Sequence, residues 1–147
     1  MSMVKFELYQ HQSAVALSEE CLEKFEELSR LALQRISTMP PEEDHVLSEL
    51  DLVEASLVDD ETIARVHLDF MDIPGATDVI TFHHGEILVS VETAVVQARE
   101  HGEELEREIF RYLVHGLLHL QGHTDAEPDK RAAMHEVQEA LVAELWD

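Results

Sequence analysis

The chain has 147 residues, 45% of them hydrophobic, which is enough to bury one sizeable core. Its 10 Lys and Arg against 32 Asp and Glu give a formal net charge of −22 at pH 7, which argues against general nucleic-acid binding. No run approaches the roughly eighteen apolar residues of a membrane span, and residues 1–6 lack the pattern of a signal peptide. We therefore expect one soluble, cytoplasmic domain over residues 1–147, with its only cysteine, Cys21, reduced and buried.

The acidity still permits a local site for an anionic substrate. Many of the carboxylates fall on expected helix faces, such as residues 19–27, where they are solvated. A divalent ion is often the largest charge in its site, and salt limits the repulsion to about 8–10 Å. A metal-centred groove is therefore compatible with the overall charge.

The first half of the chain predicts two strands and two helices. Residues 4–9 alternate apolar and polar side chains with the period of a half-buried strand. From Ser18 onward, apolar residues recur at helical spacing until the prolines at 40–41 stop the pattern. Residues 47–58 form a strand-like run, and the acidic stretch 59–62 is typical of a helix start.

The second half predicts a hairpin followed by helices. After a loop at 73–76, the β-rich runs 78–82 and 86–90 are joined by a short connection. Three helices are expected after this hairpin, over about 91–101, 104–121 and 127–145. The whole pattern predicts an α+β fold, in which a mixed, roughly four-stranded sheet is surrounded by about five helices.

The residues that suggest chemistry lie in H-G-L-L-H-L-Q-G-H-T-D, which begins at His115. His115 and His119 are four apart on a helix, so both imidazoles can reach one ion. Gly122 can end this helix in the left-handed conformation and turn the chain back. Asp125 then lies six residues beyond His119, the offset at which the pattern H-E-x-x-H-x-x-G-x-x-H places its third ligand. His123 is the competing candidate for that ligand.

The combination of these features predicts a metal cleft formed by a helix and the turn after it. A histidine pair alone is weak, because surface or core pairs are common and the chain has ten histidines. Three ligands leave a coordination position for water, as in hydrolytic sites. Gly116 stands where H-E-x-x-H peptidases place their general-base glutamate, so that mechanism is disfavoured. This glycine either leaves room for a bulky substrate or makes a helix–helix contact.

Three ordered segments resemble the YbeY family. Residues 115–125 are similar to its H-G-x-L-H-L-x-G-Y-D-H. T-D-V-I-T-F at 77–82 resembles its T-D-V-L-S-F, and residues 85–94 resemble its G-D-I-x-I-S-x-E-T-A. The resemblance covers roughly residues 47–145. The firm matches in the first segment are His115, Gly116, Leu118, His119, Leu120 and Gly122.

The resemblance implies a single-strand-specific endoribonuclease with one Zn²⁺ per chain, although another divalent metal is possible. It implies work on the 3′ end of 16S rRNA in the small ribosomal subunit, and in ribosome quality control. Two departures from the family bear on its function. Its third histidine falls on Asp125, a harder ligand, and the arginine that it often has before T-D-V is Met71 here.

We expect the ion, held by His115, His119 and Asp125, to activate water for hydrolysis of a phosphodiester bond. His123, at the family's tyrosine position, could take part as a base or could simply face solvent. Thr77 and Asp78 could bind substrate in the cleft or cap a turn. The rival functions are hydrolysis of another substrate, such as a peptide, and a non-catalytic ribosome assembly factor with a structural metal.

Overall fold

The computed structural model describes residues 4–147, so Met1–Met3, part of the segment expected to lack a signal peptide, lie outside the described residues. The described part contains four strands and five α-helices, which confirms the predicted α+β class. Within it, no helix is both long and apolar enough to cross a membrane. The elements are β1 (Lys5–Gln10), α1 (Glu19–Ser37), the short 3₁₀ turn η1 (Leu47–Glu49), β2 (Leu52–Val58), α2 (Asp60–Met71), β3 (Val79–Phe82), β4 (Glu86–Ser90), α3 (Val91–His101), α4 (Leu105–Leu120) and α5 (Pro128–Leu145).

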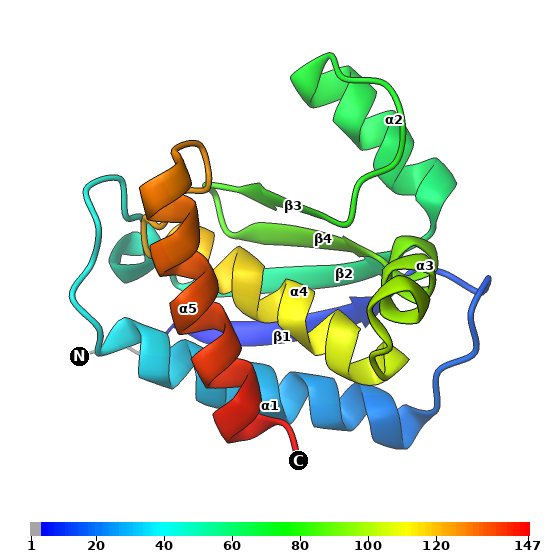
Figure 1. Ribbon diagram of the computed structural model, residues 1–147, viewed down its shortest axis with the longest axis horizontal. Coiled ribbons are helices and arrows are strands. Elements are labelled where there is room, and N and C mark those ends of the chain that lie inside the picture. Colours follow the sequence, from blue (N-terminus) through cyan, green and yellow to red (C-terminus); the bar gives the residue numbers. More distant parts are fainter. Residues whose placement is uncertain (1–3) are drawn as a thin grey trace.

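The four strands form one mixed sheet in the order β1-β2-β4-β3 (Figure 1). β1 pairs with β2 and β2 with β4 in parallel, whereas β3 and β4 are antiparallel. The hairpin predicted over residues 78–90 is thus confirmed. β3, which directly follows Thr77 and Asp78, is an edge strand of this sheet.

The strand expected over residues 47–58 is shorter than predicted. Leu47–Glu49 form the turn η1 instead of strand. Leu47 is only 1% exposed, and the backbone N–H of Val46 donates to the carbonyl of Leu120 at 2.9 Å. The segment is therefore held against the end of α4, which keeps it out of the sheet.

The sheet has a different cover on each face. On one face, α1 and α4 pack against the strands and α5 lies outside them (Figure 1). This side holds the main core, in which Val53, Ala55 and Ile87 are fully buried. On the other face α2 packs through Ile63, while its far end projects from the body.

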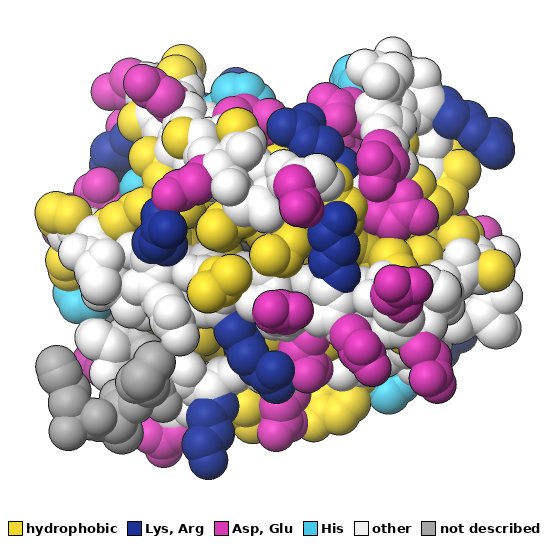
Figure 2. Space-filling model, turned by 90° about the horizontal axis from the view of Figure 1, so that it is seen from below, with side chains coloured by type: hydrophobic (Ala, Val, Ile, Leu, Met, Phe, Trp, Pro, Cys, Tyr) yellow, Lys and Arg dark blue, Asp and Glu magenta, His cyan; other side chains and the backbone are white. Residues whose placement is uncertain are grey.

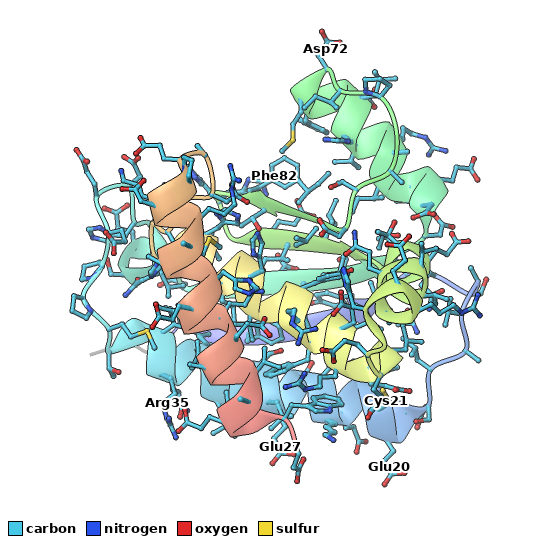
Figure 3. All side chains as sticks on the ribbon, in the orientation of Figure 1. Glu20, Cys21, Glu27, Arg35, Asp72 and Phe82 are labelled. Atoms are coloured by element: carbon cyan, nitrogen blue, oxygen red, sulfur yellow. The ribbon has the colours of Figure 1, made fainter. Side chains whose placement is uncertain are left out.

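Most acidic side chains of α1 lie on its outer side, as the sequence predicted, but Glu26 instead accepts a hydrogen bond from the backbone N–H of Leu8 at 3.0 Å. Glu20 and Glu27 are exposed and point away from the sheet, as does Arg35 (Figure 3). Seen from below, acidic and basic side chains are interspersed over this face (Figure 2). Cys21 is half-buried rather than buried, and desolvation raises the pKa of its thiol to about 11, so it stays protonated at neutral pH.

Gly116 allows α4 to lie close to β4. A Cβ atom at this position would lie 2.8 Å from Cγ2 of Ile87, closer than real Cβ contacts allow. The glycine is buried, and its close neighbour is a strand residue. Both expectations for Gly116 were therefore wrong: it neither leaves space for a substrate nor packs against a helix.

Gly122 ends α4 as the sequence predicted. Its φ of +98° lies in the left-handed region, where glycine is favoured. A Cβ here would also lie 2.9 Å from Cβ of Glu42 and from the backbone nitrogen of His45. The turn that follows brings residues 123–125 back alongside the last turns of α4.

Candidate metal centre

Three side chains converge at the C-terminal half of α4. The Nε2 atoms of His115 and His119 lie 3.0 Å apart, and each lies 3.7 Å from Oδ2 of Asp125. Ligand atoms that surround a tetrahedral zinc ion at its usual bond lengths lie about 3.4 Å from one another. The triangle formed by these three atoms therefore has the size that a single ion of this kind requires, and the cluster could hold a metal ion.

Hydrogen bonds on the far side of each imidazole fix which nitrogen carries the proton. Nδ1 of His115 lies 2.7 Å from Oε1 of Gln138, and Nδ1 of His119 lies 3.0 Å from the carbonyl oxygen of His123. Because both partners are acceptors, each Nδ1 donates its hydrogen and each Nε2 retains a lone pair. Two lone pairs that face each other at 3.0 Å repel, and a cation between them removes the repulsion. The donor set thus fits a metal ion.

The electrostatics of the cluster favour the neutral form of His119. Burial, and then the nearby His115, lower the pKa of His119 below its usual value of 6.5. A neutral imidazole is the form that binds a metal. Asp125 contributes one negative charge to the cluster, so the three side chains can offset half of the charge of a divalent ion.

A chain of polar contacts extends from His115 into α5 and back to α4. Nε2 of Gln138 donates to Glu139 at 3.2 Å, which agrees with Oε1 facing His115. Glu139 accepts two hydrogen bonds from Arg111, at 2.7 and 3.0 Å. Arg111 also pairs with the buried Glu108. The orientation of His115 is therefore supported by a network of charged groups.

The sequence analysis missed Gln138 and Arg111. Gln138 lies 23 residues beyond His115, on another helix, so no local spacing indicates the contact. Arg111 did leave a signal, because Arg111, His115 and His119 follow each other at intervals of four and thus share one face of α4. A polar stripe on an otherwise apolar helix could have identified it.

The cluster opens onto two hollows. The larger, which we call the α4–α5 groove, has a volume of about 480 Å³, and its lining includes His115, Asp125 and Arg131. The smaller, which we call the α2–β3 pocket, has a volume of about 210 Å³, and its lining includes His119 and Met71. The cluster of ligand atoms thus lies where substrate can approach it.

The remaining predicted residues lie around the cluster in different ways. Asp78 lines the α4–α5 groove and Thr77 the α2–β3 pocket, while Oδ1 of Asp78 also accepts from the backbone N–H of Val79 at 2.8 Å. Asp78 therefore both caps the start of β3 and faces the groove. His123 contacts the cluster through its carbonyl oxygen, and it is Asp125 whose side chain reaches the two imidazoles. The roles of Thr77, Asp78 and His123 in substrate binding or catalysis remain predictions.

Comparisons with known proteins identify the family of the chain. A family model described as "Endoribonuclease YbeY" matches residues 9–146. Curated relatives of the same name include one from Nocardia farcinica, 34% identical over 70% of this chain and 65% of its own length. Another, from Myxococcus xanthus, is 39% identical over 60% of this chain and 35% of its own length, and one from Cutibacterium acnes is 33% identical over 82% of each. The chain thus spans less than two thirds of the first two relatives.

A solved structure shows the same fold. The solution structure of TM1509 from Thermotoga maritima matches with a TM-score of 0.66 and 24% identity, over 96% of this chain and 89% of that one. At this identity the likeness concerns the fold alone. The family match, which covers most of the sequence, and the relative from Cutibacterium acnes confirm the resemblance found in the three motifs: the chain belongs to the YbeY family.

Proposed function

We propose that the chain is a metal-dependent endoribonuclease that hydrolyses single-stranded RNA. The name of the family and of its curated relatives supports the reaction. The single observation that carries the proposal is the convergence of three ligand atoms, from His115, His119 and Asp125, at the edge of the α4–α5 groove. A site of three ligands beside a groove leaves coordination positions for water and substrate.

The residues of this chain would hold and orient the reacting groups. His115, His119 and Asp125 would hold a divalent ion, which as a Lewis acid would acidify water and polarise a phosphate oxygen. Gln138 and the carbonyl of His123 hold both imidazoles in the tautomer whose Nε2 lone pair would be available to the ion. His123 is our candidate for the base that accepts the proton of the attacking water.

The bound strand would lie along the two hollows that meet at the cluster. Thr77 and Asp78, at the start of β3, would contact the RNA from the side opposite α5. His115 and His119 have side chains that are 24% and 25% exposed, and Asp125 is 51% exposed. This exposure favours a catalytic metal site, which exchanges substrate and water. A structural metal site is normally closed to solvent.

The finer parts of the proposal follow the family resemblance. We propose Zn²⁺ as the ion, since two imidazoles suit zinc and the carboxylate is tolerated in hydrolytic zinc sites. The proposed substrate is the 3′ end of 16S rRNA in the small ribosomal subunit, with a role in ribosome quality control. This substrate would place the protein in the cytoplasm.

One observation favours a second candidate function, hydrolysis of a substrate that is not a polyanion. Several carboxylates line the α4–α5 groove, and the formal net charge of the chain is −22. Both features repel RNA at long range. A peptide would not meet this repulsion.

The test is a cleavage assay with matched substrates. The zinc-loaded protein is incubated with an end-labelled single-stranded RNA, its duplex and a peptide library, with and without a chelator. We expect cleavage of the single strand alone, loss of it with the chelator and recovery with added Zn²⁺. His119→Ala should be inactive, whereas His84→Ala, which removes an exposed hairpin histidine, should be active. Peptide cleavage without RNA cleavage, or RNA cleavage that survives metal removal, would contradict the proposal.

A further inference from the structure

Two arginines, Arg111 and Arg131, line the α4–α5 groove, and they differ in how far carboxylates neutralise their charge. Arg111 is bonded to Glu139 through two nitrogens and also pairs with Glu108 and Glu103. Its side chain is only 12% exposed. Three carboxylates therefore neutralise Arg111, which leaves it little capacity to attract an anion.

Arg131 lines the same groove without such neutralisation. It lies in the first turn of α5, and its Nε donates to the carbonyl oxygen of Asp125 at 3.0 Å. Among the ion pairs of residues 4–147, none joins Arg131 to a carboxylate within 4.0 Å. Because Nε is the only guanidinium nitrogen bonded in this way, the two terminal nitrogens keep their hydrogens free.

The position of Arg131 next to Asp125 couples it to the candidate metal centre. Asp125 presents its carboxylate to His115 and His119, and its backbone carbonyl to Arg131. The guanidinium and the ligand cluster thus lie on two sides of one residue. A guanidinium offers paired N–H donors that match the oxygens of a phosphate, and its charge is permanent.

We propose that Arg131 binds a phosphate of the RNA strand beside the bond to be cut. This inference rests on the proposed function and adds a substrate-binding residue to it. The two hollows then differ in the charge that they offer to the RNA. Met71 in the α2–β3 pocket provides no positive charge, whereas Arg131 provides one in the α4–α5 groove. The strand is therefore anchored by α5.

The alternative is that Arg131 only holds the loop that carries Asp125. The two roles differ in what they affect. An anchor for phosphate acts on substrate binding and on its salt dependence, whereas a tether for Asp125 acts on the metal. Arg131→Gln removes the charge but keeps an N–H donor, and Arg131→Lys keeps the charge but loses the paired donors. Arg35→Gln, on the outer side of α1, is the matched control for a lost charge.

The experiment measures zinc content, kcat and KM for a single-stranded RNA oligonucleotide at several salt concentrations. For Arg131→Gln we expect unchanged zinc content, a KM raised by about tenfold, as for loss of a charge-assisted hydrogen bond, and little change in kcat. The slope of log KM against log salt should fall by about 0.7, the value for one phosphate contact on a single strand. Arg131→Lys should keep the wild-type slope, and Arg35→Gln should match the wild type in all three quantities.

Two results would overturn the inference while leaving the proposed function intact. One is RNA cleavage by Arg131→Gln with the wild-type KM and salt slope. The other is loss of zinc in Arg131→Gln with a normal salt slope, which would make Arg131 a tether only. A wild-type protein that binds zinc and does not cleave RNA would instead overturn the proposed function, and the inference with it.

Discussion

The 16-residue helix α4 has one face buried in the core and one face that carries the candidate metal ligands. Leu113, Leu117 and Leu120 on the sheet side are fully buried. His115 and His119 on the other side have side chains about a quarter exposed, next to a groove. Because the buried face fixes the helix in place, the exposed face can hold two imidazoles at a set distance while solvent and substrate still reach them.

The largest effect on stability is expected from truncation of the buried face. Leu117→Ala leaves a cavity in a fully buried part of the core, which should lower the free energy of unfolding by about 2–5 kcal/mol. His119→Ala removes a partly exposed side chain and should change it far less when no metal is present. Urea unfolding of both variants with a chelator measures the difference. An equal loss of unfolding free energy in the two variants would contradict the view that only the buried face stabilises the fold.

Gly116→Ala tests the contact that places α4 against the sheet. The new methyl group would lie 2.8 Å from Cγ2 of Ile87. We expect a net loss of about 1–2 kcal/mol, because overpacking outweighs the better helix propensity of alanine. Ile87→Ala removes the clashing atoms, so the double variant should lose less free energy of unfolding than the sum of the losses in the two single variants. Strict additivity in urea unfolding would show that the contact does not limit the packing of α4.

Gln138→Leu tests the support of the exposed face. Leucine cannot accept the hydrogen from Nδ1 of His115, so the ring loses its fixed tautomer and orientation. Zinc affinity should fall by about 10- to 100-fold, with only a small change in metal-free stability. Competition with a zinc-binding dye measures the affinity. Gln138→Glu, whose carboxylate can still accept this hydrogen, should retain most of it, and equal affinity in all three proteins would exclude the proposed support.

The smallest effect is expected from Glu139→Gln, and it depends on pH. Burial raises the pKa of Glu139, but its hydrogen bonds with Arg111 and Gln138 outweigh this and lower the pKa below 4.5. The ionised group thus stabilises the fold above the unfolded value of 4.5, and this contribution is lost as pH falls through the folded pKa. The wild type should exceed the variant in urea midpoint at pH 7 by a small amount that shrinks below pH 4.5. A constant difference would argue against the ion pair as its source.

Much of the fold followed from local patterns, because helix periods, caps and the short hairpin connection are encoded in neighbouring residues. The helix 91–101 and the end of α4 at Gly122 agree with the structure. The turn η1 could not be predicted, since it depends on a contact with Leu120, far along the chain. The role of Gly116 likewise depends on Ile87, which lies on a strand.

The candidate site shows the same limit. The spacing of His115, His119 and Asp125 predicted that their side chains could meet, because a helix turn and a glycine bend are local features. The partners that orient them are not local. Gln138 comes from α5. The packing of the turn after Gly122 determines that the side chain of Asp125, and the carbonyl oxygen of His123, face the imidazoles. Sequence spacing can therefore predict candidate ligands, whereas the hydrogen-bond partners that orient them are known only once the fold is known.

We propose that His115, His119 and Asp125 hold one metal ion. Metal analysis of the purified protein tests it most directly, beside His119→Ala, Asp125→Ala and His123→Ala. We expect about one zinc per chain in the wild type and in His123→Ala, because the backbone carbonyl of residue 123 remains. We expect loss of the ion in His119→Ala and Asp125→Ala. Zinc retained in Asp125→Ala, or lost in His123→Ala while Asp125→Ala keeps it, would contradict the proposed ligand set.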